Sequence, residues 1–171
     1  MKIILLGYMS SGKSTVGKKL SQRLYIPFID LDSYIEKKEK SSVKDIFKEK
    51  GEIFFRLLEH KYLKELIASN KKFVLSLGGG TPCYSNNMEY LTKNSDIISI
   101  YLHASILTIV NRLKYNKNRP LITGIKENKL SDFVSKHLFE RSFFYNKATY
   151  KVSVDNKTVE KIVTEIRIIL A

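Results

Sequence analysis

The chain has 171 residues, 43% of them hydrophobic, and its 30 lysines and arginines exceed its 17 aspartates and glutamates to give a formal net charge of +13. This length predicts one domain with a substantial core, and no apolar run reaches the roughly 18 residues of a membrane-spanning helix. The charge suits nucleic acid as a partner, and it equally suits an enzyme whose substrates are anions. Because the lysines are scattered along the chain, we expect most of them on solvated helix faces, with no nucleic-acid and no membrane partner.

The location predicted from the sequence is cytoplasmic. Residues 1–6 faintly resemble a signal peptide, but their apolar stretch is short and leads directly into a glycine-rich segment that cleavage would destroy. The single cysteine, Cys83, can form no internal disulfide and fits a reducing compartment. The three histidines are far apart and form no compact metal-binding pattern, so we expect structural or solvated roles for His60, His103 and His137.

Short apolar runs alternate with amphipathic segments along the chain. Strands are predicted at residues 2–6, 26–29, 73–77, 97–102 and 151–154, and helices at 13–24, 43–49, 52–68, 86–93, 105–114, 129–146 and 158–169. Residues 42–45 form a capping-box pattern that opens one helix, and Gly51 is expected to end it. This alternation predicts an α/β fold, a parallel sheet covered by helices on both faces, which binds ligands beyond the carboxyl ends of its strands.

Residues 7–15, Gly-Tyr-Met-Ser-Ser-Gly-Lys-Ser-Thr, follow the first predicted strand and precede the first predicted helix. They fit the pattern G-x-x-x-x-G-K-[ST], the P-loop. Backbone N–H groups of such a loop and the positive end of the helix converge on phosphate oxygens. Lys13 is expected to reach the β- and γ-phosphates and the Ser14 hydroxyl to hold Mg²⁺. The alternative is a turn that contains Gly-Lys by chance, which the strand–loop–helix context disfavours.

Two carboxylates, Asp30 and Asp32, follow the second predicted strand. In an extended chain residues i and i+2 point to the same face, so we expect both to project toward the P-loop. One could hold Mg²⁺ together with phosphate oxygens, and the other could accept the proton of an attacking hydroxyl. The alternative is a helix N-cap after a strand, but the position in a P-loop protein favours the carboxylate pair. Since no acidic residue ends the third strand, Asp30 is the better metal candidate.

Further along the chain, three segments carry glycines or arginines that could contact ligands. Residues 78–80 are consecutive glycines after the third strand, which suggests close approach of the backbone to a ligand or, alternatively, a flexible turn. Arg56 and Glu59 are neighbours on one helix face or, alternatively, a surface ion pair. Arg119 lies in a basic, loop-like segment that could close over phosphates as a lid, or could be a solvated loop. Arg141 is predicted on the long helix that follows.

In chain order the P-loop, F-I-D-L-D, F-F-R-x-x-E, L-S-L-G-G-G, R-P-L and E-R-x-x-x-Y together resemble the shikimate kinase family over nearly the whole chain. The resemblance implies a P-loop NTPase fold like that of nucleoside monophosphate kinases, with a five-stranded parallel sheet in the order 2-3-1-4-5. It implies a single kinase domain over residues 1–171, a substrate-binding region at about 32–62 and a lid at about 112–124. The implied reaction is Mg²⁺- and ATP-dependent phosphorylation of the 3-hydroxyl of shikimate, a step of chorismate and aromatic amino-acid biosynthesis, by a monomer.

The resemblance also implies roles for individual residues. ATP contacts are expected at Ser10, Ser11, Gly12, Lys13, Ser14, Thr15, Arg112 and Arg119, with Arg112 near the adenine. Shikimate contacts are expected at Asp32, Arg56, Gly78, Gly79, Gly80 and Arg141, where the two arginines clamp the carboxylate. Mg²⁺ is expected at Ser14 and Asp30. The catalytic residues implied are Asp32 as base or orienter, Lys13 and Arg119, while residues 155–157 stand where the adenine loop should be and receive no firm role.

One residue departs from the family pattern, since Ser10 replaces the usual middle glycine of the P-loop and raises a question about local backbone angles. Two rival functions remain. A gluconate or nucleotide kinase would share the fold, but the two arginines with three glycines suit a small hydroxy-carboxylate. A nucleic-acid-binding P-loop protein would explain the positive charge, but the chain contains no recognition motif for it.

Overall fold

In the computed structural model, which describes residues 1–115 and 124–171, the five strands form one sheet. The strands are β1 (Lys2–Leu6), β2 (Phe28–Asp30), β3 (Phe73–Ser76), β4 (Ile97–His103) and β5 (Tyr150–Ser153). All neighbours pair in parallel, in the order β2-β3-β1-β4-β5, which confirms the predicted sheet. In the central strand Ile4 pairs with Leu75 on one side and with Ser99 on the other.

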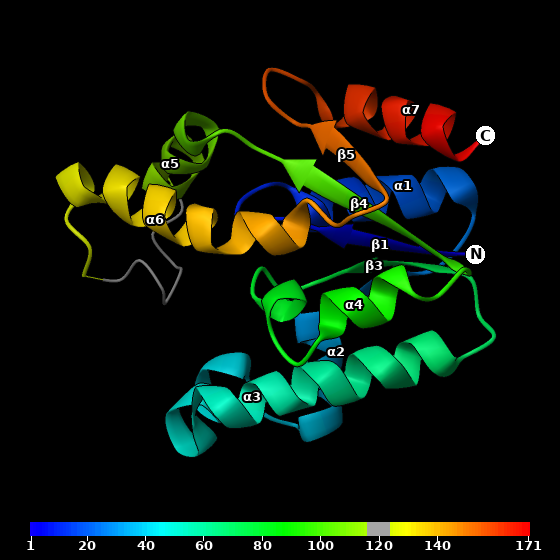
Figure 1. The fold of residues 1–171 in the computed structure, drawn as a ribbon, viewed down its shortest axis with the longest axis horizontal. Coiled ribbons are helices and arrows are strands. Elements are labelled where there is room, and N and C mark those ends of the chain that lie inside the picture. The colour runs from blue at the N-terminus through cyan, green and yellow to red at the C-terminus, as the bar shows by residue number, and fades with distance from the viewer. Residues whose placement is uncertain (116–123) are drawn as a thin grey trace.

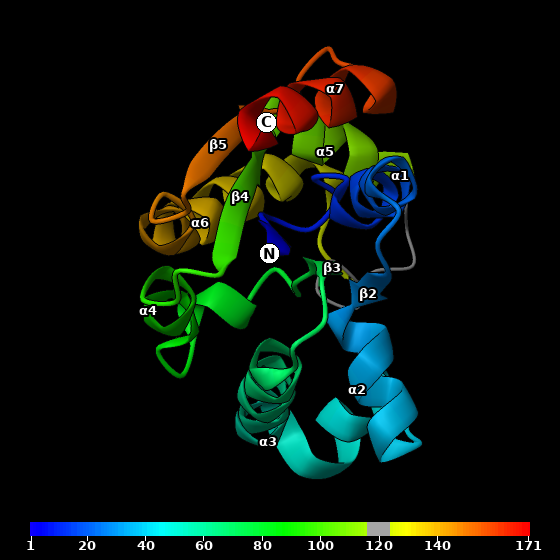
Figure 2. The same cartoon turned by 90° about the vertical axis from the view of Figure 1, so that its right-hand side faces the viewer.

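The helices are α1 (Lys13–Leu24), α2 (Leu31–Glu39), α3 (Val43–Ala68), α4 (Asn87–Thr92), α5 (Ile106–Tyr115), α6 (Glu127–Tyr145) and α7 (Val159–Leu170), with a short 3₁₀ turn at Thr81–Cys83. Helices α1 and α7 pack together on one face of the sheet, while α4 and α6 lie on the opposite face, as Figures 1 and 2 show. Helices α2 and α3 pack against each other beyond the β2 edge. Both faces of the sheet are therefore covered, as predicted.

This covering explains why the strands appear as apolar runs in the sequence. Every residue of β1 is buried, and Ile3, Ile4, Leu5 and Leu6 have no exposed surface. A strand with helices over both faces has no solvent side, so it needs no polar residue at alternate positions. All five strands point the same way. The loop after β1, the start of α2 and the segment after β3 therefore meet at the carboxyl ends of the strands (Figure 1), which are called the sheet edge below.

Two predictions about local structure need correction or comment. Residues 31–39, taken as extended at their start, form α2, because Asp30 caps the helix by accepting from the Ser33 N–H. The apolar Leu31 and Ile35, one helical turn apart, are fully buried and anchor its inner face. The two helices predicted at 43–49 and 52–68 are the arms of α3, and Gly51, with φ 81°, interrupts the helix as expected.

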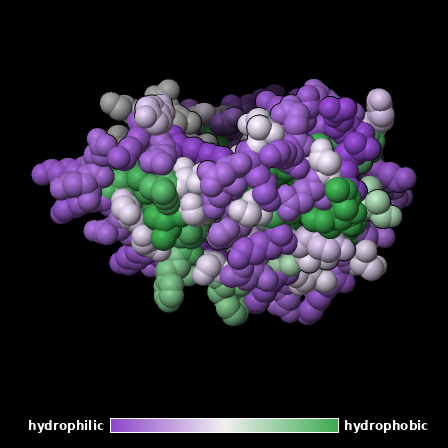
Figure 3. All heavy atoms as spheres, turned by 90° about the horizontal axis from the view of Figure 1, so that it is seen from above, coloured by the Kyte–Doolittle hydropathy of each residue, from purple (hydrophilic) through white to green (hydrophobic). Residues whose placement is uncertain are grey.

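The face seen from above in Figure 3 is mostly polar. Figure 3 shows a face on which hydrophilic residues predominate and apolar groups occupy separate areas. The lysines expected on solvated helix faces are exposed, namely Lys37, Lys38, Lys40, Lys48 and Lys50. None of the helices within residues 1–115 and 124–171 is both long enough and apolar enough to cross a membrane.

Candidate functional site

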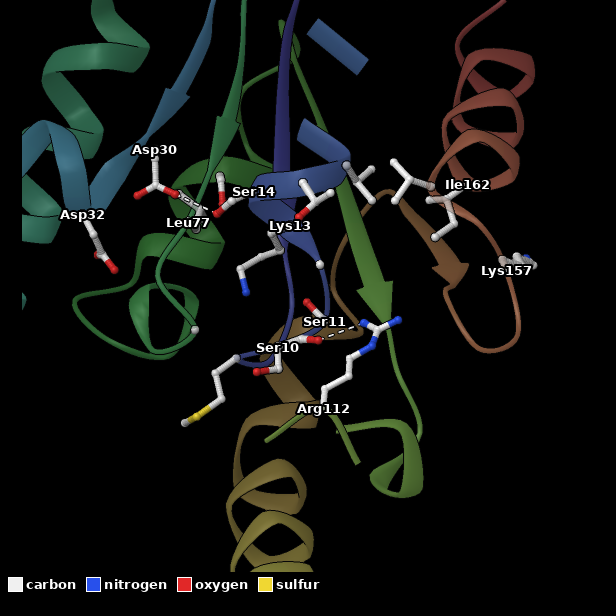
Figure 4. A pocket seen from close by; sticks show the side chains of 17 residues that line it. Ser10, Ser11, Lys13, Ser14, Asp30, Asp32, Leu77, Arg112, Lys157 and Ile162 are labelled. Carbon is white, nitrogen blue, oxygen red and sulfur yellow. Dashed lines mark hydrogen bonds between the residues drawn. The ribbon is translucent and has the colours of Figure 1, made fainter. Parts of the chain in front are cut away.

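The loop between β1 and α1 has the backbone conformation of a phosphate-binding loop. Gly12, at the N-cap of α1, has φ 96°, a left-handed value that glycine adopts without strain. Ser10 has φ 62°, so it occupies a left-handed position that glycine adopts more readily. Its carbonyl oxygen accepts a hydrogen bond of 2.9 Å from Arg112 Nη1 of α5, drawn in Figure 4. Arg112 therefore holds the strained turn that Ser10 makes.

Lys13 and Ser11 place a cation and a hydroxyl within this loop. The Lys13 Nζ donates to the carbonyl oxygens of Gly7 and Tyr8, each at 2.9 Å, so the side chain folds back across the loop. The Ser11 hydroxyl is buried and finds no hydrogen-bond partner among the described residues. A buried hydroxyl without a partner is costly. The loop thus combines donors and positive charge at the N-terminus of α1, an arrangement that suits a phosphate.

Asp30 and Ser14 meet as the sequence predicted. The Ser14 hydroxyl donates to Oδ2 of Asp30 at 3.0 Å, and Oδ1 of the same carboxylate caps α2. Asp30 is therefore both the helix cap that was the alternative interpretation and the neighbour of Ser14. A hydroxyl and a carboxylate oxygen side by side on a cavity wall are the hard oxygen donors that Mg²⁺ prefers, and they leave room for the waters and phosphate oxygens it usually keeps.

Asp32 lies in the first turn of α2, so the extended geometry predicted for it is wrong, yet its side chain still lines the cavity. Its Oδ1 is buried and has no hydrogen-bond partner within the described part of the chain. Burial, and then the negative charges of Glu59 and Asp30, raise the pKa of Asp32 to about 6, against the opposing effect of Lys13. A carboxylate with this pKa can accept a proton near neutral pH.

These residues surround a cavity of about 400 Å³, seen in Figure 4. Asp30 and Asp32 point in from one side, Lys157 and Ile162 lie on the opposite side, and Lys13 lies between them. The predicted residues on its wall are Ser10, Ser11, Gly12, Lys13, Ser14, Thr15, Asp30, Asp32, Gly79 and Arg112. Sequence reasoning missed Val159 and Ile162 and left Lys157 without a role. The spacing of Val159 and Ile162 on one face of the last helix was the available signal, but that pattern looks the same for a core contact.

Next to this cavity lies a cluster built on Arg56. Its Nη1 donates to Glu59 Oε2 at 2.6 Å and its Nη2 to Glu52 Oε1 at 3.1 Å. The surface-pair alternative is wrong, because the Glu59 side chain is only 1% exposed and also accepts from the Thr81 hydroxyl at 2.6 Å. A Cβ on Gly80 would lie 2.7 Å from the Arg56 guanidinium. A larger residue at this position would therefore require the Arg56 guanidinium to move.

Arg141 reaches the same glycine-rich segment from α6. It is buried to 7% exposure, and a Cβ on Gly79 would lie 3.1 Å from its Nη1. No carboxylate within the described ranges lies at salt-bridge distance from Arg141, whereas Arg56 already has two. The positive charge of Arg141 opposes the rise in the pKa of Glu59, so the two groups lie near each other, but Glu59 forms its ion pair with Arg56. Arg141 is therefore suited to an anionic group brought by a ligand.

The cavity and the arginine cluster adjoin each other at Gly78. A Cβ on Gly78 would lie 3.2 Å from Asp32 Oδ1 and 2.9 Å from Glu59 Oε1. The structure thus brings the predicted phosphate-binding and acceptor-binding residues to one edge of the sheet. Arg119 and most of the predicted lid lie outside the described residues.

Comparison with known proteins identifies one family over nearly the whole chain. The family model described as "Shikimate kinase" matches residues 9–171. A shikimate kinase of Flavobacterium johnsoniae is 52% identical over 171 residues, with 99% of each chain covered. A crystal structure of shikimate kinase from Bacteroides thetaiotaomicron superimposes with a TM-score of 0.90 at 35% identity, over 99% of this chain and 98% of that one.

Two further structures define the limits of the likeness. Shikimate kinase from Acinetobacter baumannii, solved in complex with shikimate, gives a TM-score of 0.88 at 29% identity, covering 99% of this chain and 92% of that one. A gluconokinase from Sinorhizobium meliloti gives 0.61 at 18% identity, over 96% of this chain and 87% of that one, which is a likeness of fold alone. The match over nearly the whole length shows that this chain belongs to the shikimate kinase family.

Proposed function

We propose that the protein transfers the γ-phosphoryl group of ATP to the 3-hydroxyl of shikimate. The observation that supports this most is the position of Asp32, a carboxylate with a pKa of about 6 between the P-loop cavity and the arginine cluster. In the reaction, the bond from the 3-oxygen to the γ-phosphorus forms, and the bond from that phosphorus to the leaving oxygen of ADP breaks. The hydroxyl proton passes to Asp32 and then to solvent. The rest of the site positions the two substrates and balances their charge.

In this proposal the P-loop cavity holds ATP. The Lys13 ammonium leaves its two carbonyl acceptors to contact the β- and γ-phosphates, while the Ser11 hydroxyl and the loop N–H groups donate to phosphate oxygens. Arg112, which lines the cavity and holds the Ser10 carbonyl, lies on the nucleotide side. The apolar Val159 and Ile162 of α7 offer a surface for the base.

Mg²⁺ would be held by Ser14 and Asp30, whose oxygens already lie 3.0 Å apart. When bound, the ion neutralises charge on the phosphates. This proposal fits the absence of an acidic residue at the end of β3, where Ser76 is buried. Asp30 therefore combines a structural role, capping α2, with a role toward the metal.

The acceptor would occupy the side of Asp32 that faces Arg56 and Arg141. Arg141, buried and without an acidic partner in the described ranges, is the principal contact for the substrate carboxylate. Arg56 gives a second contact, although Glu52 and Glu59 already occupy several of its donors. Gly78, Gly79 and Gly80 bring backbone close to the acceptor. Arg119 remains the predicted contact from the lid to the transferred phosphoryl group.

Three further parts of the proposal concern the protein as a whole. We propose a monomer in the cytoplasm that acts on small molecules and does not require nucleic acid. The lone Cys83 supports the reducing location, and burial raises the pKa of its thiol to about 11, so the thiol is unreactive. The exposed lysines fit anionic substrates and solubility.

The test is release of ADP from Mg-ATP in the presence of one acceptor at a time. Shikimate, gluconate, nucleoside monophosphates and dephospho-coenzyme A are compared at millimolar concentration with an ATP-only blank. We expect turnover with shikimate and at least about 100-fold lower kcat/KM with the others. Nucleoside monophosphates and dephospho-coenzyme A lack a carboxylate for Arg141, and gluconate carries one on an open chain, which places its hydroxyls differently relative to Asp32. No turnover with shikimate, or faster turnover with another acceptor, would refute the proposal.

A further inference from the structure

Helix α6 carries three residues spaced four apart, His137, Arg141 and Tyr145, which share one face of the helix. The first and last of these residues, His137 and Tyr145, form hydrogen bonds with the P-loop and with the segment after β3. His137 Nδ1 lies 3.0 Å from the hydroxyl oxygen of Tyr8 in the P-loop, and the Tyr145 hydroxyl donates to the Gly79 carbonyl at 2.6 Å. Arg141 is thus flanked, one turn away on each side, by a hydrogen bond to a different part of the site.

Tyr8 connects the P-loop cavity with the arginine cluster. Its backbone carbonyl accepts from Lys13, and its ring lies under the guanidinium of Arg141, with 5.7 Å from Cζ to the ring centroid. The ring also meets the His137 imidazole edge to face, at 5.5 Å between centroids, and Phe133 packs on the imidazole at 5.4 Å. Tyr8 is 1% exposed, so these contacts are fixed by packing.

The protonation states suit a hydrogen bond from Tyr8 to His137. Burial raises the pKa of Tyr8 to about 12, so its hydroxyl keeps its proton at neutral pH. Burial, and then the positive charge of Arg141, lower the pKa of His137, so its ring is neutral and Nδ1 can accept. A second cation so close to Arg141 is thereby avoided.

We propose that the hydrogen bond between Tyr8 and His137 is a positioning pair that fixes α6 against the P-loop and so places Arg141 for the acceptor carboxylate. The proposal rests on the proposed function. It follows from the geometry, because no ion pair fixes Arg141 within the described ranges, so its place depends on its helix and on its contacts with Tyr8 and Tyr145. Small displacements of a positioning group can cost up to about 100-fold in rate. Tyr145 anchors the other end of the same face.

The first test replaces Tyr8 by Phe, which keeps the ring and removes only the hydroxyl. Because a buried hydrogen bond contributes roughly 0.5–1.5 kcal/mol, we expect KM for shikimate to rise by about 3- to 10-fold, while KM for ATP changes less than about twofold. The matched control is Ser99→Ala, which removes the hydroxyl of a buried residue on β4 that is bonded to Thr149, outside the predicted substrate-binding region. This control should leave both KM values within about twofold of wild type.

The second test uses His137. His137→Leu removes the acceptor and should reproduce the rise in KM for shikimate, whereas His137→Asn offers an oxygen near the place of Nδ1 and should restore at least half of the lost affinity. When His137→Leu is added to Tyr8→Phe, KM for shikimate should rise by less than about a further twofold, since both changes break the same hydrogen bond. Thermal unfolding of each variant establishes that the folded protein is being measured.

The outcomes separate the two proposals. If wild-type protein does not phosphorylate shikimate, the proposed function fails. If wild-type protein does so and Tyr8→Phe leaves KM for shikimate unchanged, only the positioning pair fails. Equal increases of KM for both substrates, or an equal increase of KM for shikimate in Ser99→Ala, would show general loosening of the fold and would also overturn the pair.

Discussion

Replacing Asp32 by Asn should stabilise the fold while abolishing turnover. Folding moves the pKa of Asp32 from the ordinary 3.8 to about 6, mainly because burial opposes its charge. A shift of about 2 pKa units corresponds to about 3 kcal/mol by which the ionised form is disfavoured in the folded state. Asn still leaves a polar group at the position where Oδ1 has no partner among the described residues, which offsets part of this gain by roughly 1 kcal/mol. The expected net gain is about 2 kcal/mol.

The gain should depend on pH with a definite sign. A raised carboxyl pKa destabilises the folded state fully above pH 6, where Asp32 is ionised both folded and unfolded. The penalty fades as pH falls through 6 toward 3.8, because the folded protein then takes up the proton first. The advantage of Asp32→Asn should therefore be about 2 kcal/mol at pH 8, or about 4–8 °C in Tm, and near zero at pH 4.

Urea unfolding of the ligand-free protein at both pH values measures this difference. Asp132→Asn is the matched control, because Asp132 is exposed on α6 and its replacement should change the free energy of unfolding by less than about 0.5 kcal/mol. ADP release with shikimate should fall at least about 100-fold in Asp32→Asn, since the proton acceptor is gone. Equal stability of Asp32→Asn and wild type at pH 8, or an advantage that does not change with pH, would refute the argument from burial.

Three other predictions concern neighbouring groups. The value of kcat/KM for shikimate should be about tenfold lower at pH 5 than at pH 7, because Asp32 with a pKa of about 6 loses its charge; a flat profile would contradict this. Arg56→Ala should raise KM for shikimate at least about tenfold, as measured by steady-state kinetics. It should also lower the free energy of unfolding by about 3 kcal/mol in urea, since buried Glu59 loses its partner. An unchanged KM would show that Arg56 does not bind the substrate carboxylate. Ser10→Gly relieves roughly 1 kcal/mol of left-handed strain, but the greater entropy of glycine in the unfolded chain offsets up to about 1 kcal/mol. The free energy of unfolding should therefore rise by between zero and about 1 kcal/mol in urea. A decrease of more than about 1 kcal/mol would show that the Ser10 side chain is needed.

The strands and most helices could be predicted from local sequence because burial on both faces leaves a simple mark. Residues 3–6 are apolar without alternation, and they form a fully buried central strand. The order of the strands came from the family resemblance, since no local pattern encodes which strands are neighbours. The P-loop combined a specific motif with the expected context, and its residues line the cavity as predicted.

Helix α2 was missed because the i, i+2 spacing of Asp30 and Asp32 after a strand suggested an extended carboxylate pair. Asp30 does lie next to Ser14, but it also caps α2, the interpretation that the sequence analysis disfavoured. The spacing of Leu31 and Ile35 was the available sign of a helix. Asp32 reaches the cavity by the turn of this helix, a geometry that the i, i+2 rule for strands cannot give.

The contacts that join distant segments could not be predicted. Tyr8 and His137 are 129 positions apart, and no local pattern links an aromatic residue in a loop to a histidine on a later helix. The same holds for Gly80, where the sequence suggested close approach of a ligand and the structure places the Arg56 guanidinium against the backbone. Such pairings depend on how the helices pack across the sheet edge.

The most direct test of the account is the identity of the product. Purified protein is incubated with Mg-ATP and shikimate, and the product is examined by ³¹P and ¹H NMR for coupling between phosphorus and a ring proton. The account predicts one equivalent of ADP for each shikimate consumed and phosphorus coupled to the proton on carbon 3. Phosphorylation at another hydroxyl, or ATP hydrolysis without a phosphorylated product, would contradict it.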